Sequence, residues 1–366
     1  MEAVSDTDEW RVLQSFFPDG WESEARRLGA FRRARYTDSP ARLLRLLLFH
    51  AVNDGGLRTT VALAKASHLA DVSAVALFKR LRRSGAWLRW LAEGLSRPLR
   101  DRPSVPRGLR PRALDSTTIQ GPGASTSDWR LHYTLDLLTL ACDWHELTTG
   151  HEAEALERTP VAPGDVLIGD RAYFRAAGVR SVVRAGGHVL VRMRWKHPGL
   201  VDREGVAQSA LSLATTLRVG EVGDWPVWIP EENAEPVSGR VVALKLPEEI
   251  AERARKRVRR MASKKQQELD PRSLEAAGYL MLFTTLPAEV VDRAAIAELY
   301  RYRWQIELAF KRHKQLLRLG ELPHKDAAAA AGWILSKLVV ALLIETLYRR
   351  SVAFSPWGYD ISELSG

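Results

Sequence analysis

The sequence predicts an α/β protein in which a mixed sheet flanked by helices follows an N-terminal helical domain. Apolar residues recur at helical spacing from Trp10 to about Leu95, and a segment rich in proline and arginine then interrupts the chain. Strand-like segments begin at Ala113. Three strands in succession, and then alternating helices and strands, indicate a mixed sheet with helices packed on it.

Length and composition are those of a globular protein. The 366 residues suffice for two or three domains, and a hydrophobic content of 46% suffices for sizeable cores. The 54 Lys and Arg residues exceed the 44 Asp and Glu residues, and the resulting charge of +10 favours polyanionic partners. A single cysteine, Cys142, excludes an intramolecular disulfide and a cysteine-rich zinc site. The acidic opening MEAVSDTDEW has no apolar segment, so we expect no signal peptide and a cytoplasmic protein.

The N-terminal helical region contains a candidate DNA-binding hairpin. Two short helices are expected on either side of a turn around Ala70 to Ser73, with Ser73 as the N-cap of the second helix. The outer side of the second helix carries four cations, Lys79, Arg80, Arg82 and Arg83. This pattern fits a helix-turn-helix whose second helix enters a major groove, and a purely structural helical bundle is the alternative. Prolines between Ser96 and Arg112 forbid a continuous helix and mark a domain boundary.

The expected elements after the linker follow in order. The sheet strands are Ala113 to Ile119, Asp128 to Leu140, Ala141 to Thr148, Val166 to Gly169 and His188 to Trp195, with helices at His151 to Glu157 and Phe174 to Arg184. Shorter strands are expected at Ala214 to Val219, Asp224 to Ile229 and Arg240 to Leu246, and a last strand at Tyr279 to Thr285. Before that last strand, ERARKRVRRMASKK predicts a helix with eight cations and one anion. Such a helix is either a solvated charged helix or a contact for a phosphate backbone.

Two aspartates stand where strands of the expected sheet present side chains. Asp115 follows the apolar Leu114, and Asp170 follows Ile168 and Gly169. Acidic residues at strand ends are often only turn formers or helix caps, but α/β sheets build their sites at strand ends. Two aspartates and a glutamate on a later helix would suit a pair of divalent cations, which prefer carboxylate oxygen and support phosphoryl displacement.

The segment YRYRWQIELAFKRHK offers such a glutamate. If the segment is one helix, Tyr300, Arg303, Glu307 and Lys314 fall within an arc of about 60°, while His313 points away. An ion-pair ladder on a surface helix is the alternative interpretation.

The apolar run from Ala327 to Tyr348 has the length of a membrane span. Lys337 and Glu345 interrupt it, so we expect a buried C-terminal helix with Asp326 as its cap.

These residues resemble a known family. The pattern Y-x2-R-x3-E-x6-K is met by Tyr300, Arg303, Glu307 and Lys314, and DSTTI and DRAYF upstream begin with Asp115 and Asp170. The chain thereby resembles the DDE transposases of bacterial insertion sequences, in particular the insertion-sequence-four family, and the resemblance covers the layout of the whole chain. It implies a ribonuclease-H-like core, two Mg²⁺ or Mn²⁺ ions and cut-and-paste movement of DNA from terminal inverted repeats. A homodimer on double-stranded DNA, close to the bacterial nucleoid and away from any membrane, is the expected setting.

Carried over to this sequence, the resemblance implies domains and site residues. The helical DNA-binding domain would be residues 1–105, the catalytic core 106–198 and 276–322, a strand-rich insertion 199–275, and a C-terminal helical region 323–366. Asp115, Asp170 and Glu307 would be catalytic metal ligands. The expected DNA contacts are Tyr300, Arg303, Lys314, Lys79, Arg80, Arg83, Arg171, Arg255 and Arg259. Tyr279, Trp225 or Trp228 would stack on a flipped base, with core packing as the alternative role for each.

Two other functions remain compatible with the sequence. One is a metal-dependent nuclease on the same fold, which cuts DNA without joining it. The other is a non-catalytic DNA-binding regulator or domesticated transposase that uses the region from Thr59 to Arg83.

Overall fold

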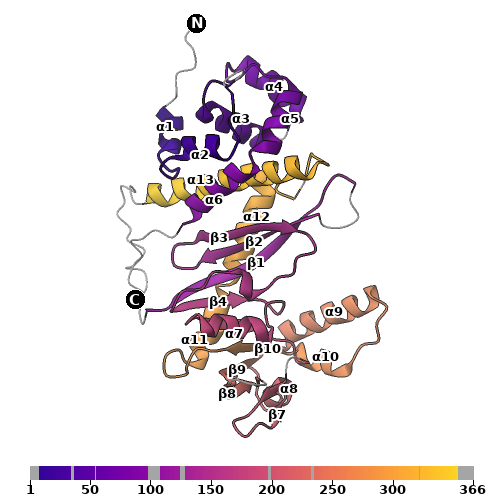
Figure 1. Cartoon of the computed structure of the whole chain (residues 1–366). Coiled ribbons are helices and arrows are strands. Elements are labelled where there is room, and N and C mark those ends of the chain that lie inside the picture. Colours follow the sequence, from indigo (N-terminus) through magenta and orange to yellow (C-terminus); the bar gives the residue numbers. More distant parts are fainter. Residues whose placement is uncertain are drawn as a thin grey trace.

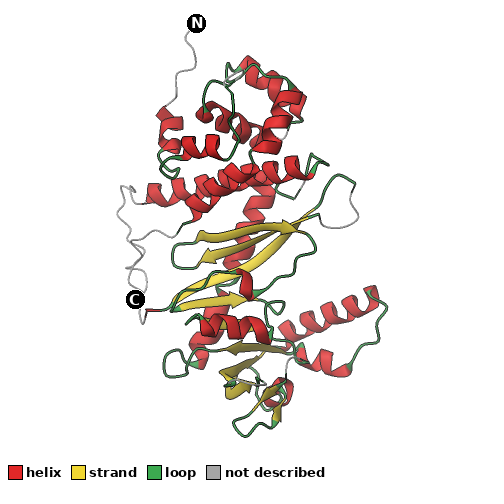
Figure 2. Cartoon of the chain, viewed as in Figure 1, coloured by secondary structure: helices red, strands yellow, loops and turns green. Residues whose placement is uncertain are grey.

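The computed structural model describes residues 8–33, 37–53, 55–97, 108–123, 128–196, 199–231, 235–320 and 322–352. Most of the proline-rich linker, residues 98–107, lies outside these ranges. Helices gather at one end of the molecule and along the faces of a single large sheet (Figures 1 and 2). Helix α13 runs between the N-terminal helices and the sheet, so it joins the two parts of the fold (Figure 1).

The N-terminal part is entirely helical in the residues described. Its helices are α1 (Asp8–Gln14), α2 (Trp21–Arg27), α3 (Pro40–Val52), α4 (Leu57–Ala66), α5 (Ala74–Arg83) and α6 (Gly85–Ser96). The amide of Ala76 donates to the Ser73 hydroxyl at 3.1 Å, which makes Ser73 the N-cap of α5 as expected. Helices α4 and α5 therefore form the expected hairpin. Leucines of α3, α5 and α6 fill the core beneath it.

Ten strands form one sheet in the order β3-β2-β1-β4-β5-β10-β9-β8-β6-β7. The strands are β1 (Arg110–Ile119), β2 (Trp129–Asp136), β3 (Ala141–Thr149), β4 (Asp165–Gly169), β5 (His188–Arg192), β6 (Leu200–Val201), β7 (Ala207–Gln208), β8 (Val222–Ile229), β9 (Val237–Lys245) and β10 (Tyr279–Thr284). Strands β1, β4 and β5 are parallel to one another, and the other pairs are antiparallel. The order β3-β2-β1-β4-β5 is that of a ribonuclease-H-like core, which confirms the expected fold class. Strands β8 and β9 continue this sheet beyond β10.

Helices cover both faces of the sheet. On one face, α11 (Arg293–Arg301) and α12 (Trp304–Leu317) pack with α13 (Ala327–Val352) against alternate residues of β1, β2 and β4. On the other face lie α7 (Ala176–Arg184) and α8 (Ala210–Ala214), with the core around Leu114 and Leu167. Helices α9 (Glu248–Lys264) and α10 (Pro271–Ala276) connect β9 to β10, and α9 projects from the body (Figure 1).

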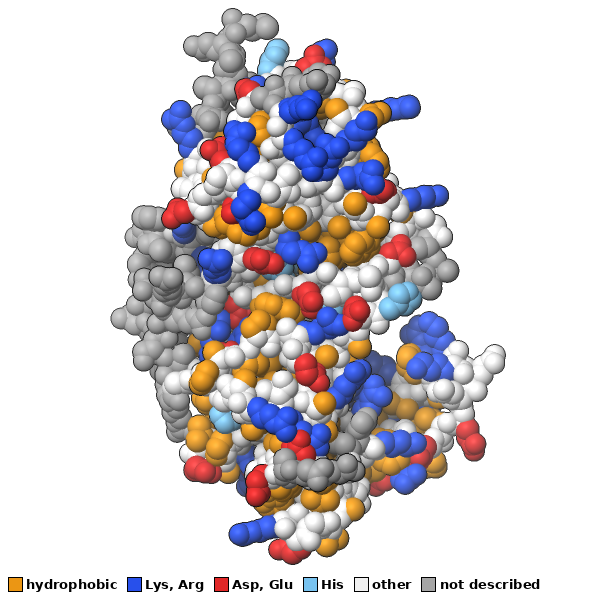
Figure 3. Space-filling view, viewed as in Figure 1, with side chains coloured by type: hydrophobic (Ala, Val, Ile, Leu, Met, Phe, Trp, Pro, Cys, Tyr) orange, Lys and Arg blue, Asp and Glu red, His pale blue; other side chains and the backbone are white. Residues whose placement is uncertain are grey.

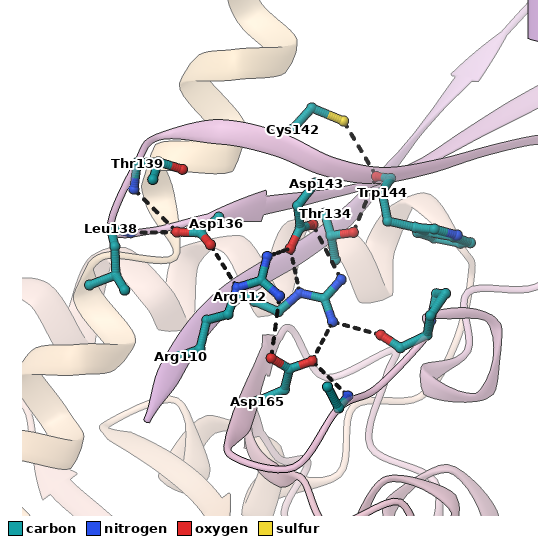
Figure 4. Close-up of polar contacts among 12 residues, drawn as sticks. Arg110, Arg112, Thr134, Asp136, Leu138, Thr139, Cys142, Asp143, Trp144 and Asp165 are labelled. Carbon is teal, nitrogen blue, oxygen red and sulfur yellow. Dashed lines mark hydrogen bonds and ion pairs between the residues drawn. The ribbon is translucent and has the colours of Figure 1, made fainter. Parts of the chain in front are cut away.

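A buried ion-pair network fastens the first residues of β1 to β4 and to the turn after β2 (Figure 4). The Arg112 guanidinium donates to Asp143 at 2.6 Å and to Asp165 at 2.9 Å. Arg110 donates to Asp136 at 2.7 Å and also contacts Asp143 and Asp165. A second Asp136 oxygen accepts from two amides of the following turn. The network fixes the relative register of β1 and β4, and therefore the positions of the residues at their opposite ends.

Helix α13 is a core helix. By length and composition, its segment Ala327–Arg350 could cross a membrane, but 72% of its most apolar window is buried inside the protein. Its Lys337 amine donates to the Leu317 carbonyl and lies 4.1 Å from the Trp333 ring. Its Glu345 accepts from the Tyr133 hydroxyl at 2.8 Å. The amide of Ala329 donates to Asp326 at 2.9 Å, so Asp326 caps the helix as expected.

The expected single helix from Tyr300 to Lys314 is wrong, because the chain bends at Tyr302 and Arg303. Helix α11 ends at Arg301, α12 begins at Trp304, and the junction is tightened by hydrogen bonds between residues three apart. In a straight helix, the α11 residues Ile296 and Tyr300 would point about 80° away from Ile306 and Phe310 of α12. All four are buried, in two different clusters, and the bend allows both helices to bury their apolar sides.

Two smaller expectations are also wrong. The segment His151 to Glu157 is not a helix; only a short 3₁₀ turn, Leu156–Arg158, forms, because Arg158 pairs with Glu152 and with Glu146. Most of Ala214 to Val219 is turn, because Ser209 caps the short helix α8 that ends at Ala214. His313, expected only to point away from Glu307, is buried beside Tyr133 and Phe310.

Candidate active site

The site begins with three residues in one row across parallel strands. Ala113 of β1 is level with Ile168 of β4, so two residues further Asp115 is level with Asp170. Gly169 is level with Val191 of β5, which places Arg192 beside Asp170. Residues level with one another in adjacent strands point to the same face, here the face covered by α11 and α12.

Asp115 is a partly buried carboxylate whose charge is disfavoured mainly by burial. Its Oδ1 accepts from the Ser116 amide at 2.8 Å. Burial raises the pKa of Asp115 to about 7, and the charges of Glu154 and Asp170 add to this shift, whereas the Ser116 amide and Arg303 oppose it. Near neutral pH, Asp115 is therefore divided between its charged and neutral forms.

A polar cluster beside Asp115 includes residues that the sequence reasoning missed. The Ser116 hydroxyl donates to Glu154 at 2.6 Å, while Arg130 donates to Ser116 at 3.1 Å and pairs with Glu154 at 3.3 Å. Arg130 stands on β2, near the register partner of Ser116, and this pairing could have been anticipated once β1 and β2 were recognised as a hairpin. Glu154 stands in an irregular segment, where no sequence pattern signals its position.

Asp170 lies in a tight turn that Gly169 makes possible. The Ala172 amide donates to Asp170 Oδ1 at 2.7 Å, and the Tyr173 amide donates to the Asp170 carbonyl at 3.2 Å. A Cβ on Gly169 would lie 3.0 Å from the buried Tyr173 side chain, so a larger residue would force the turn apart. Arg171 in this turn is exposed.

The junction of α11 and α12 covers the row of strand residues. The Arg303 guanidinium pairs with Glu307 and lies 5.7 Å from the Tyr300 ring. Burial alone would lower the pKa of Arg303, but Tyr300, Glu307 and Asp115 together raise it. Burial raises the pKa of Tyr300, and the charge of Asp170 adds to that shift. The structure thus brings Tyr300 near Asp170 and Arg303 near Asp115, and Arg303 interacts with Asp115 on one side and Glu307 on the other.

The half-buried cation Arg192 is a further residue of this site that the sequence did not single out. Burial lowers its pKa, the nearby Arg171 and Arg303 lower it further, and Tyr300 and Asp170 oppose the shift. Arg192 could have been found from the sequence, because it lies near the end of an expected strand that follows the strand leading to Asp170. Lys314 differs from these residues, because its side chain is exposed to solvent.

The carboxylate oxygens of Asp115, Asp170 and Glu307 are the kind of ligand that a hard divalent cation prefers, but the three side chains do not converge on one point. Among the described residues, no three His, Cys, Asp or Glu side chains lie close enough to hold a metal ion together. Asp115 and Asp170 are neighbours with oxygen donors, and the raised pKa of Asp115 shows that added positive charge would be favourable. Glu307 is 57% exposed and is held by Arg303, so it would have to leave that guanidinium to join the aspartates.

A second charged surface, which we call the basic groove, lies on the N-terminal helices. It is a hollow of about 510 Å³ between α5 and the chain before α3, and its cations are Arg32, Arg33, Lys79, Arg80 and Arg83. Burial lowers the pKa of Arg80, and the charge of Arg83 lowers it further. Blue side chains gather over this part of the surface in Figure 3. Arg82 instead faces α13, where it pairs with Asp326 at 3.1 Å.

The remaining candidates lie in the segment between β5 and β10. Arg255 and Arg259 on α9 are paired with Glu248 and Glu252. Tyr279 is only 7% exposed and belongs to the core. Its place therefore agrees with core packing, the alternative to base stacking. Trp225 and Trp228 on β8 are partly exposed, and Trp225 also packs against that core.

Comparison with known proteins adds an independent line of evidence. Residues 106–343 match the family of the transposase DDE domain. The chain is 33% identical to the putative transposase InsL of insertion sequence element IS186A from Escherichia coli K12, over 95% of this chain and 96% of that protein. It is also 33% identical to the transposase of insertion sequence element IS421 from Escherichia coli, with the same coverage. A solved structure of piggyBac transposase in a synaptic complex with hairpin DNA aligns at a TM-score of 0.48 and 10% identity, over 95% of this chain and 74% of that one.

Proposed function

The chain belongs to the DDE transposase family and is an insertion-sequence transposase of the insertion-sequence-four type, and we propose that it moves its element by cut-and-paste. In this proposal the enzyme binds the terminal inverted repeats as a homodimer in the bacterial cytoplasm, close to the nucleoid and without membrane contact. It hydrolyses one strand at each end to leave a 3′-hydroxyl. That hydroxyl then attacks a phosphate of the target DNA, so one phosphodiester bond forms as another breaks.

The observation that carries this proposal is the row formed by Asp115 and Asp170 beneath the junction that holds Arg303 and Glu307. Enzymes of this family use divalent metal ions. We assign Asp115, Asp170 and Glu307 as the residues that would hold two Mg²⁺ or Mn²⁺ ions. When bound, the ions would lower the pKa of the attacking water or hydroxyl and stabilise the leaving oxygen.

Other residues of the site would bind and orient the DNA. The Nε of Arg303 is buried and has no hydrogen-bond partner among the described residues, so it can donate to a phosphate oxygen. Tyr300 and Arg171 lie around the same strand ends and would contact neighbouring phosphates. Lys314, exposed two turns beyond Glu307, would act as a point charge further along the backbone.

DNA would also contact the N-terminal part, and aromatic stacking would come from β8. Lys79, Arg80 and Arg83 line the basic groove, where burial of uncompensated positive charge favours a phosphate. Of the three aromatic candidates, Trp225 and Trp228 are the ones with exposed surface for a flipped base.

The test is metal-dependent nicking of DNA that carries the element ends. Wild-type protein should nick this DNA with Mg²⁺, and Asp170→Ala and Glu307→Gln should each lose activity by at least about a hundredfold, since each removes a ligand. Undiminished nicking in these variants would refute the assigned site. Pre-cleaved ends supplied with target DNA distinguish the remaining functions. Joined product is expected of a transposase, cutting without joining indicates a nuclease, and DNA binding without any metal-dependent product indicates a non-catalytic DNA-binding protein.

A further inference from the structure

Helix α9 is an arm that leaves the sheet. It follows β9, returns through α10 to β10, and buries only Ala251 among its residues. Figure 1 shows it projecting on the side toward which the arrowheads of β1 and β4 point, which is the side of Asp115 and Asp170. An elongated ligand held at the catalytic strand ends would extend past this arm.

The charges of α9 are divided between two sides of the helix. Glu248, Glu252, Arg255 and Arg259 fall within an arc of about 60° and pair with one another, with Arg259 and Glu252 2.8 Å apart. The two guanidiniums that the sequence suggested for DNA are thus occupied by carboxylates of their own helix.

The other side of the helix carries a row of cations that we call the α9 stripe. It consists of Lys256, Arg257, Arg260 and Lys264, which lie within an arc of about 100° and are all exposed. In the described part of the chain, no carboxylate lies within ion-pair distance of any of them. Blue side chains mark this projecting part of the surface at the right of Figure 3.

A helix gains nothing from such a row unless an anion faces it. Lys256, Arg260 and Lys264 are spaced by four residues, and each like-charged pair at this spacing disfavours the helix by about 0.2–0.5 kcal/mol. The stripe rises about 12 Å along the axis, at 1.5 Å per residue, whereas one DNA strand presents a phosphate about every 3.4 Å of its axis. The stripe is therefore long enough to meet more than one phosphate of a strand.

We propose that the α9 stripe, and not the paired guanidiniums of Arg255 and Arg259, is a docking surface for the phosphate backbone of duplex DNA held at the active site. This inference rests on the proposed function and specifies the path of the DNA beyond the catalytic residues. The contact is with phosphates only, so it acts on any sequence and is salt-dependent.

Two matched double variants of the full-length protein test it. Arg257→Gln/Arg260→Gln removes two guanidiniums from the stripe, and Arg255→Gln/Arg259→Gln removes two from the ion-paired side of the same helix. Binding to a fluorescein-labelled duplex of arbitrary sequence is measured by anisotropy over a series of KCl concentrations. The plot of log K against log salt should become shallower by about 1–1.8 for the stripe variant, because two phosphate contacts are lost, and should change by less than about 0.5 for the control.

Equal changes in the two variants would show only a general effect of net charge, and no change in either would show no contact; both results overturn the proposal. Circular dichroism confirms that α9 and the remaining helices are retained, which is expected because all four substituted residues lie at the surface or are only partly buried. Metal-dependent nicking by wild type and its loss in Asp170→Ala do not depend on the stripe. The salt dependence of binding can therefore refute the inference while nicking supports the proposed function. Conversely, an absence of nicking would refute the proposed function whatever the stripe variants show.

Discussion

Asp115→Asn should stabilise the protein at alkaline pH while removing its activity. In the native protein, burial raises the pKa of Asp115 to about 7, against an ordinary value of about 3.8. A carboxyl group with a raised native pKa stabilises the fold below the unfolded-state pKa, and this contribution is lost as the pH rises toward 7. Between pH 5 and pH 8, the loss amounts to about 2–3 kcal/mol, at 1.36 kcal/mol per pKa unit. Asparagine cannot ionise, so the free energy of unfolding of the variant does not fall in this way as the pH rises.

Urea unfolding of the metal-free proteins at pH 5 and pH 8 measures the effect. The free energy of unfolding of the variant, relative to wild type, should rise by about 2–3 kcal/mol between the two pH values. The difference between two pH values is informative even if the substitution also alters packing, because a packing term is the same at both. A relative free energy that stays constant with pH would refute the argument that burial raises the pKa of Asp115.

Three further outcomes follow from other contacts. Glu154→Gln should lower the pKa of Asp115, because a nearby negative charge is removed, and the pH dependence of unfolding reports it. Arg112→Ala should lower the free energy of unfolding by up to about 3–5 kcal/mol in urea, because two buried aspartates lose one of their two guanidinium partners and keep only Arg110. Gly332→Ala should cost about 1–3 kcal/mol in thermal unfolding, since its Cβ would lie 2.4 Å from a backbone oxygen of α5, whereas Gly85→Ala meets nothing within 4 Å and should not destabilise.

Local patterns in the sequence predicted much of the catalytic core. Asp115 and Asp170 follow apolar runs of strand length, and parallel strands with register fixed by buried ion pairs bring such residues together. Ser73 and Asp326 were recognisable as helix caps because capping is a property of the residues immediately around a helix start. These features depend on neighbours within about one turn or one strand.

The parts that could not be predicted depend on distant contacts. Whether Tyr300 and Ile306 belong to one helix or two is decided by two separate core clusters, which the segment itself does not reveal. Arg192 enters the site only through the order of strands in the sheet. Glu154 reaches Ser116 from an irregular segment 38 residues away. His313 is buried because Tyr133, from β2, packs against it.

Two acids of the site are not yet available to a cation. Burial keeps a proton on part of Asp115 near neutral pH, and Glu307 is paired with Arg303 outside the row of aspartates. Adding a divalent cation would favour ionised Asp115, which links cation binding to proton release between about pH 6 and 8. A phosphate that accepts from Arg303 would likewise free Glu307 for the aspartates. DNA and cation would then each make the binding of the other more favourable, because each removes the charge that opposes the other.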